Sequence, residues 1–120
     1  MILVDTSIWA NHLHRPIEHL LKAIGDGIVV HHPFVTGELA LGNPANRMKM
    51  VEMLNALPPT HIVDQGSLIA FVEANAIGGT GIGFVDAHLL ASAFGQKLQL
   101  WTLDKRLTAQ AERLGLAYKH

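Results

Sequence analysis

Short apolar segments alternate with longer amphipathic segments along this chain, and that alternation constrains its fold more than any other feature. Strands separated by helices pair in parallel, and the helices cover both faces of the sheet. We therefore expect an α/β domain of three layers, α/β/α, with a central parallel sheet of four to five strands. The segments expected to form strands are 2–4, 28–31, 61–63, 98–102 and 116–118. The expected helices are 6–14, 17–24, 33–42, 47–57, 66–77, 84–94 and 104–114.

The helical segments carry recognisable periodicity and end signals. Ile17, Leu20, Leu21 and Ile24 recur at the spacing of one helix face, and glycines follow them. Pro33 suits the first turn of the next helix because its missing N–H would be unpaired there anyway. These signals support the helical assignment.

Composition limits the class of protein. With 120 residues, of which 49% are hydrophobic and 16% charged, we expect residues 1–120 to form a single domain with one core. Cysteine is absent, which excludes disulfides and thiolate metal sites. The first residues lack a signal-peptide pattern and no apolar run suits a membrane span, so we expect a cytoplasmic protein. A mean hydropathy of +0.26 favours a partner or a second subunit.

Four carboxylates lie inside apolar runs: Asp5, Glu38, Asp86 and Asp104. An ionised acid in such a place is costly unless something pairs with it, and clustered acids repel one another. In a parallel sheet, Asp5 and Asp104 follow strand ends at the same edge, and the other two belong to helices that begin near it. Hard cations such as Mg²⁺ or Mn²⁺ prefer oxygen ligands, so the sequence predicts a metal site there.

Taken singly, three of the four acids have a simpler explanation. Asp5 and Asp104 each precede a helix and suit an N-cap, and Asp86 suits the positive end of a helix dipole. Glu38 has the weakest such explanation, because a glutamate in mid-helix among apolar neighbours is hard to keep solvated. We interpret Ser7 as a capping hydroxyl rather than a nucleophile, since no histidine-acid pair is placed to activate it.

Four segments of the chain resemble the PIN-domain family, and most closely the VapC-type toxins of toxin-antitoxin pairs. They are VDTSIW at the start, T-x-EL around Glu38, GFVDAHLLASA around Asp86 and LWTLDKRL around Asp104. The resemblance follows the order of these motifs over nearly the whole chain. It implies a PIN-like fold and a metal-dependent endoribonuclease that is usually dimeric.

The resemblance also implies partners and residue roles. The substrate would be RNA, with tRNA or rRNA as plausible targets, and cleavage would inhibit translation and growth until a cognate VapB-type antitoxin binds. Asp5 and Asp86 would be the principal Mg²⁺ ligands, while Glu38 and Asp104 would complete the pocket and orient the attacking water. All four therefore count as predicted catalytic residues and metal ligands.

Further residues are predicted to contact RNA or a partner. Thr6 and Thr102 match polar positions beside the family's metal site, and Lys105 and Arg106 adjoin an acid where they could contact RNA phosphates. The apolar face of residues 48–57 is wide enough to bind an antitoxin helix or a second subunit.

Trp9 and Trp101 are expected in the core or at an interface rather than as base-stacking platforms. The glycine-rich turn at 78–83 lacks the lysine and hydroxyl of a P-loop. The buried or surface histidines are expected to play supporting roles rather than to ligate metal.

Three other functions compete with a toxin nuclease. Haloacid-dehalogenase-like phosphatases need a second aspartate where this chain has Ser7, and receiver domains need a phosphoacceptor for which Asp64 is a faint candidate. A PIN-like RNA-processing or binding module without toxin role is the non-enzymatic alternative. The presence of all four acids favours the nuclease.

Overall fold

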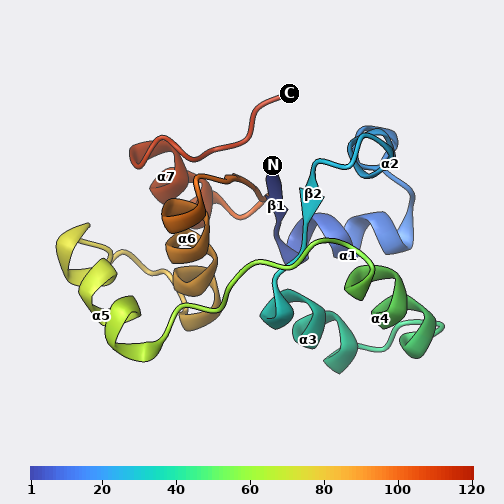
Figure 1. Cartoon of the computed structure of the whole chain (residues 1–120), viewed down its shortest axis with the longest axis horizontal. Coiled ribbons are helices and arrows are strands. Elements are labelled where there is room, and N and C mark those ends of the chain that lie inside the picture. Colours follow the sequence, from blue (N-terminus) through green and yellow to red (C-terminus); the bar gives the residue numbers. More distant parts are fainter.

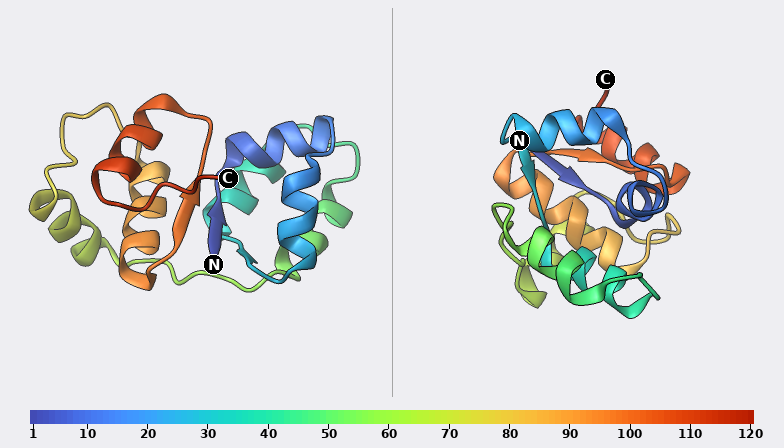
Figure 2. Two further views of the ribbon diagram at one scale, coloured as in Figure 1. Left: turned by 90° about the horizontal axis from the view of Figure 1, so that it is seen from above. Right: turned by 90° about the vertical axis from the view of Figure 1, so that its right-hand side faces the viewer.

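A small parallel sheet lies between two groups of helices in the structure, a computed structural model that describes residues 1–120. In chain order the elements are β1 (Ile2–Val4), α1 (Thr6–His14), α2 (Glu18–Gly25), β2 (Val29–Val30), α3 (Pro33–Leu41), α4 (Arg47–Asn55), α5 (Gln65–Ala74), α6 (Phe84–Gln96), β3 (Gln99–Trp101) and α7 (Lys105–Arg113). Helices α1 to α4 gather on one side of the strands and α5 to α7 on the other (Figures 1 and 2). The expected α/β/α arrangement is confirmed.

Strand β1 is the centre of the sheet, whose order is β2-β1-β3. It pairs in parallel with both neighbours, and Leu3 lies opposite Val30 on one side and Leu100 on the other. All three residues of β1 are at most 2% exposed. A strand covered on both faces needs a continuous apolar run, which is what Ile2 to Val4 supply.

The first edge of the sheet differs from expectation. Residues 61–63 do not form a strand, and the chain instead makes one isolated parallel bridge between His31 and Pro59, where the Thr60 N–H donates to the His31 carbonyl at 2.8 Å. Pairing stops there because β2 runs straight into helix α3, whose first residue, Pro33, has no N–H to offer.

The second edge is shortened in the same way. The expected strand at 116–118 is a single bridge between Ala117 and Leu100, with the Tyr118 N–H donating to the Leu100 carbonyl at 2.9 Å. Strand β3 ends at Trp101 because the chain turns there to begin α7. The sheet thus has three strands and one bridge at each edge, where we expected four to five strands.

Helix α3 begins with a buried histidine. His32 is 0% exposed, and its Nδ1 accepts a hydrogen bond from the Phe34 N–H at 3.0 Å. Burial, with smaller contributions from His88 and His31, lowers the pKa of His32 to about 4. The imidazole is therefore neutral near pH 7, which leaves Nδ1 free to accept and to cap the helix.

The main core contains 22 buried side chains, and Trp9 and Trp101 belong to it, as expected. No helix is both long and apolar enough to cross a membrane. Helix α4 ends at Asn55, two residues before the predicted end. Of its apolar stripe, Met50 and Leu54 are buried, whereas Met53 is 41% exposed.

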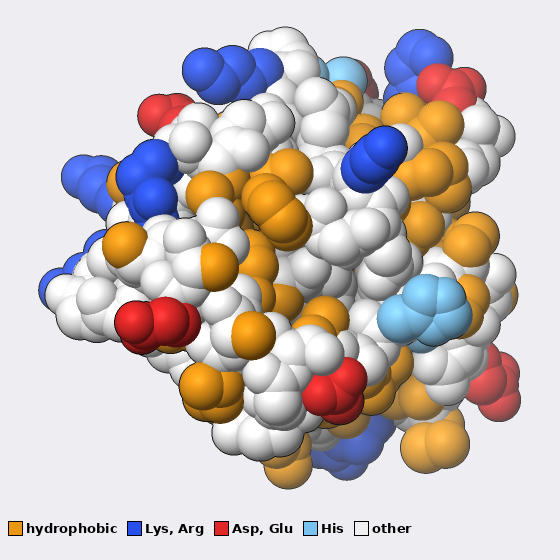
Figure 3. Space-filling view, turned by 60° about the vertical axis from the view of Figure 1, so that its left-hand side comes forward, with side chains coloured by type: hydrophobic (Ala, Val, Ile, Leu, Met, Phe, Trp, Pro, Cys, Tyr) orange, Lys and Arg blue, Asp and Glu red, His pale blue; other side chains and the backbone are white.

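Several large apolar side chains are exposed, as the positive mean hydropathy suggested. Figure 3 shows apolar side chains spread over the face that carries α5 to α7, with basic side chains gathered at the left and others around the rim. The exposed large apolar residues of the whole chain are Met1, Leu13, Leu21, Leu41, Met48, Met53, Ile62, Ile69, Phe84, Phe94 and Leu103.

Candidate active site

Asp5 is fixed at the carboxyl edge of the sheet by groups from β3, the loop that follows it and the start of α1. Its N–H donates to the Trp101 carbonyl at 2.9 Å, which anchors it beside the end of β3. The Ser7 and Thr102 hydroxyls both donate to Oδ2 of Asp5, at 2.8 and 2.7 Å. Asp5 occupies the N-cap position of α1, but its side chain makes no capping bond. The capping roles predicted for Asp5 and Ser7 are therefore wrong, because both side chains turn toward the β3–α7 loop.

Asp104 joins the same network while also capping a helix. Its Oδ1 accepts from the Leu107 N–H at 2.9 Å, which confirms the predicted N-cap of α7. Its own N–H donates to the Thr102 hydroxyl at 3.0 Å, and the Leu103 N–H donates to the Ser7 hydroxyl at 3.0 Å. Two hydroxyls thus tie this loop to Asp5, so Ser7 positions an acid. Its place two residues after a strand-end acid was the only sequence signal for this role.

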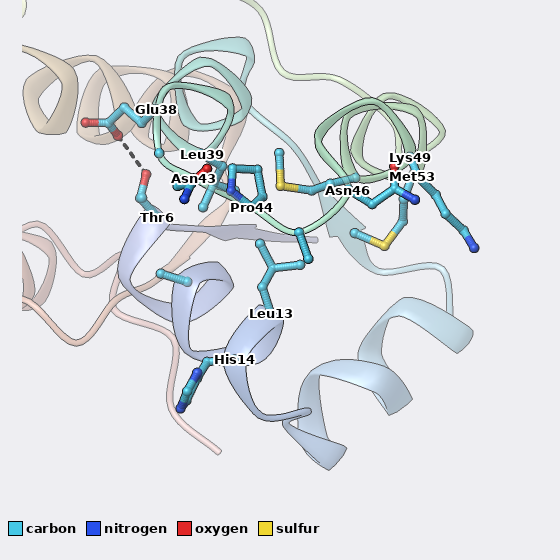
Figure 4. A pocket seen from close by; sticks show the side chains of 14 residues that line it. Thr6, Leu13, His14, Glu38, Leu39, Asn43, Pro44, Asn46, Lys49 and Met53 are labelled. Carbon is cyan, nitrogen blue, oxygen red and sulfur yellow. Dashed lines mark hydrogen bonds between the residues drawn. The ribbon is translucent and has the colours of Figure 1, made fainter.

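Glu38 reaches the site from helix α3 and is exposed. The Thr6 hydroxyl donates to its Oε1 at 2.6 Å, as the dashed line in Figure 4 shows. The sequence suggested that this side chain would be hard to solvate. That expectation is wrong, because Glu38 lines an open groove rather than the core.

Asp86 lies half-buried in the first turn of α6 and connects the four acids electrostatically. Its pKa is raised to about 6, first by burial and then by the negative charges of Asp5, Asp104 and Glu38. No hydrogen bond offsets these effects. The four acids predicted from widely separated motifs are therefore close enough to influence one group.

The donor set fits a hydrated hard cation rather than a closed metal cage. The chain's single ion pair joins Lys22 of α2 to Asp26 just beyond that helix, so no lysine or arginine forms an ion pair with the four acids. No three acidic or histidine side chains stand close enough to hold an ion between them. Mg²⁺ usually keeps several waters and binds through one or two carboxylates, so a pair of these acids suffices.

The four predicted substrate-binding residues fall into two groups, two threonines bonded to the acids and two exposed basic residues that follow Asp104. The hydroxyl protons of Thr6 and Thr102 are engaged by carboxylates, which makes these residues supports for the acids. Lys105 and Arg106 are exposed at the start of α7. Arg106 packs over Gly81, where an added Cβ would lie 3.1 Å from the Arg106 Cδ and where φ is +85°. A glycine is therefore needed at that turn.

A groove of about 740 Å³ leads away from the acids between α1, α3 and α4. Figure 4 shows Thr6 and Glu38 at one end and Lys49 and Met53 at the other. The sequence predicted only the apolar face of α4, because the groove combines segments far apart in the chain. Its lining residues are Thr6, Ala10, Leu13, His14, Glu38, Leu39, Gly42, Asn43, Pro44, Ala45, Asn46, Lys49, Met50 and Met53.

Comparison with known proteins finds relatives both in sequence and in fold. The chain is 39% identical over 118 residues to Ribonuclease VapC32 of Mycobacterium tuberculosis, in strains CDC 1551 / Oshkosh and ATCC 25618 / H37Rv, covering 98% of this chain and 95% of that protein. Its fold matches the crystal structure of FitAcB from Neisseria gonorrhoeae with a TM-score of 0.61 and 21% identity, over 93% of this chain and 94% of that one. No family model matches the chain.

Proposed function

We propose that this chain, which belongs to the VapC-type ribonucleases of the PIN-domain family, is a Mg²⁺-dependent endoribonuclease. It would act as the toxin of a type II toxin-antitoxin pair. The observation that carries the proposal is the convergence of Asp5, Glu38 and Asp104 on Asp86 without an ion pair to lysine or arginine. Cleavage of RNA would stop translation and growth.

Each acid has a distinct part in the proposed hydrolysis. When bound, Mg²⁺ would supply a Lewis acid for the scissile phosphate, and Mn²⁺ is an expected substitute. Asp5 and Asp86 would hold the ion directly or through water, and the two hydroxyls on Oδ2 of Asp5 fix that carboxylate in place. Such supporting hydrogen bonds orient ligands and raise affinity.

Glu38 and Asp104 would orient the attacking water. The water oxygen would bond to phosphorus as one P–O ester bond breaks, a carboxylate would accept the water proton, and the leaving oxygen would take up a proton from bulk water. Thr6 holds Glu38, and the capping bond holds Asp104, so both carboxylates have defined directions. Lys105 and Arg106 would contact phosphates on either side of the cut.

Asp5→Asn tests the catalytic proposal. Asparagine keeps the size of the side chain and an oxygen that accepts hydrogen bonds, but removes the negative charge. We expect the variant to lose RNA cleavage while its circular dichroism spectrum and melting temperature stay near those of the wild type. Undiminished cleavage by the folded variant would contradict the proposal.

The toxin role needs a test in cells, because an RNA-binding module would share the fold. We expect induction of the wild-type chain to arrest bacterial growth and Asp5→Asn to relieve the arrest. An arrest that Asp5→Asn leaves unchanged at equal protein level would argue against a toxin nuclease.

The antitoxin would bind in the groove beside the acids. The groove is open and largely apolar along α4, and the end beside the acids carries Thr6 and Glu38. A VapB-type segment lying there would cover the approach to the acids and so block RNA. In this proposal, the partner predicted for the apolar face of α4 is the antitoxin.

Two methionines of α4 provide a matched test of that interface. Met53 lines the groove, whereas Met48 is 66% exposed and does not line it. We expect Met53→Glu to weaken antitoxin binding measured by calorimetry, and Met48→Glu to leave it unchanged. Equal binding by both variants would exclude the groove.

Homodimer formation, which the exposed apolar residues favour, is tested by sedimentation of the free chain.

A further inference from the structure

Phe84 is an aromatic residue that the catalytic proposal does not use. It is the first residue of α6, follows the glycine-rich turn and is 59% exposed. The other rings of the chain fall mostly into the core or its margin, as Trp9 and Trp101 do. A single exposed phenylalanine needs no explanation by itself, so its surroundings decide what it can do.

The Phe84 ring is held in place from behind. It meets the His88 ring edge-to-face, with centroids 4.7 Å apart and planes at 77°. His88 is only 3% exposed, and on another side it meets Phe34 edge-to-face at 4.9 Å. Phe34 in turn packs on the His32 ring at 5.0 Å. Four rings thus form a continuous chain of edge-to-face and tilted contacts, in which Phe84 is the outermost ring.

Each supporting imidazole has one ring nitrogen that makes no hydrogen bond. His88 Nδ1 and His32 Nε2 are buried and have no partner. Packing against aromatic rings therefore accounts for the position of His88 better than polar contacts do. The consequence is a ring at position 84 that loses little freedom when something binds to it.

The same two helix starts carry these rings and two of the acids. Phe84 and His88 lie two residues before and after Asp86 in the first turns of α6, on a different face of the helix from Asp86, and Phe34 lies one turn before Glu38 on α3. An RNA phosphate held by the acids would bring its neighbouring bases beside these helix starts. A single strand held by the acids would pass close to the exposed ring of Phe84, two residues from Asp86 on α6.

We propose that Phe84 is a stacking platform for an unpaired nucleobase next to the scissile phosphate. The inference rests on the proposed ribonuclease function and adds a substrate contact to it. Every base offers a π face, so the platform would select unpaired over paired RNA rather than one base over another. It would fix the register of the strand over the acids and lower the KM for unpaired substrates.

Phe94 provides a matched control on the same helix. It is 47% exposed and rests on Phe71, with ring centroids 5.4 Å apart. Ten residues separate it from Phe84, which is about 15 Å along the helix axis. It therefore resembles Phe84 in chemistry and exposure but lies away from the acids.

The first experiment compares cleavage kinetics of Phe84→Ala, Phe84→Tyr and Phe94→Ala. The probe is a synthetic single-stranded RNA that spans a cut mapped in bulk cellular RNA, together with versions abasic at each flanking nucleotide. We expect Phe84→Ala to lower kcat/KM about tenfold, Phe84→Tyr to restore it, and Phe94→Ala to match the wild type. One abasic version should lower kcat/KM for the wild type and not for Phe84→Ala.

The second experiment observes stacking directly. Phe84→Trp and Phe94→Trp are each placed in the Asp5→Asn background, so that RNA binds without being cut, and Asp5→Asn alone gives the emission of Trp9 and Trp101. We expect the intact RNA to quench the added tryptophan at 84 but not at 94. The abasic version that defines the flanking nucleotide should quench neither.

The outcomes separate this inference from the proposed function. A wild type that cuts no RNA would overturn both. If the wild type cuts RNA and folded Phe84→Ala cuts it equally well, with the same abasic penalty, the platform is excluded and the nuclease remains. Loss of antitoxin binding by Phe84→Ala with unchanged cleavage would assign the ring to a protein partner and would also overturn the platform.

Discussion

The start of helix α5 and the acid site both contain a serine hydroxyl that donates to an aspartate carboxylate, but the two pairs have different roles. At α5, the Ser67 hydroxyl donates to Asp64 Oδ2 at 2.8 Å. At the acid site, the Ser7 hydroxyl donates to Asp5 Oδ2 at the same distance. Asp64 is exposed and caps its own helix, whereas Asp5 is 5% exposed and caps nothing. Identical local chemistry can thus serve a helix end or a site.

Electrostatics distinguishes the two regions more clearly than hydrogen bonds do. The backbone N–H and the hydroxyl of Ser67 lower the pKa of Asp64. Burial and three neighbouring acids raise the pKa of Asp86 to about 6. A lowered pKa marks Asp64 as an acid whose charge stabilises the folded state, whereas a raised pKa marks Asp86 as an acid whose charge destabilises it. Acids of the second kind are typical of functional sites.

Asp104 and Asp64 give the sharpest test of this comparison, because both cap a helix through the N–H three residues on, each at 2.9 Å. Asparagine caps nearly as well as aspartate, so both Asn variants should stay folded. We expect Asp104→Asn to lower the rate of RNA cleavage by about 100-fold or more, and Asp64→Asn to leave it unchanged. Equal activity of the two variants would mean that Asp104 is only a cap.

The two serines test the positioning of the acids. Removing a hydrogen bond that orients a metal ligand typically costs about 10–100-fold in metal affinity or activity. We therefore expect Ser7→Ala to reduce cleavage by about tenfold at limiting Mg²⁺, with a smaller loss at high Mg²⁺. Ser67→Ala serves as the control and should match the wild type in the same assay. A Mg²⁺ dependence of Ser7→Ala identical to that of the wild type would contradict the positioning role.

Asp86→Asn should stabilise the metal-free protein. A folded pKa raised from 3.8 to about 6 corresponds to about 3 kcal/mol of destabilisation, which solvent screening of a half-buried group reduces to roughly 1 kcal/mol. The folded state binds the extra proton between these pH values, so the cost is absent below pH 3.8 and complete above pH 6. The gain in the free energy of unfolding, measured by urea titration in EDTA, should therefore shrink as pH falls from 7 to 4. A loss of stability at pH 7 would contradict the origin of the shift.

Asp64→Asn should show the smallest effect, with the opposite pH dependence. Because the folded pKa of Asp64 is lowered, its ionised form stabilises the protein above the ordinary pKa of 3.8, and this contribution is lost as pH falls through the folded value. The difference in urea midpoint between wild type and variant should be present at pH 7 and vanish in acid. A difference that grows in acid would rule out the capping carboxylate as its source.

Much of the fold was predictable because local patterns report burial. The apolar run of β1 and the acid that follows it predicted a central strand with a strand-end carboxylate, and both are present. The outer strand predicted at 61–63 does not form, and the one predicted at 116–118 is reduced to a single bridge. How far an edge strand extends depends on where its neighbour turns away, which apolar composition does not encode.

The site was predictable as a set of acids but not as a geometry. Sequence placed Asp5, Glu38, Asp86 and Asp104 near one edge, and the structure brings them close enough to shift one pKa. It did not predict that Glu38 would be exposed, nor that Ser7 would hold an acid, since both depend on how α1, α3 and the β3–α7 loop pack. Contacts between distant segments follow from packing rather than from spacing.

The Mg²⁺ dependence of RNA cleavage tests the central claim, that the four acids act together as a metal-dependent ribonuclease site, most directly. Purified wild type and Asp5→Asn should be assayed on bulk RNA in excess EDTA and again after Mg²⁺ is restored. We expect cleavage by the wild type to stop in EDTA and return with Mg²⁺, and Asp5→Asn to remain inactive in both. Full cleavage in EDTA, or Mg²⁺-restored cleavage by Asp5→Asn equal to that of the wild type, would contradict the claim.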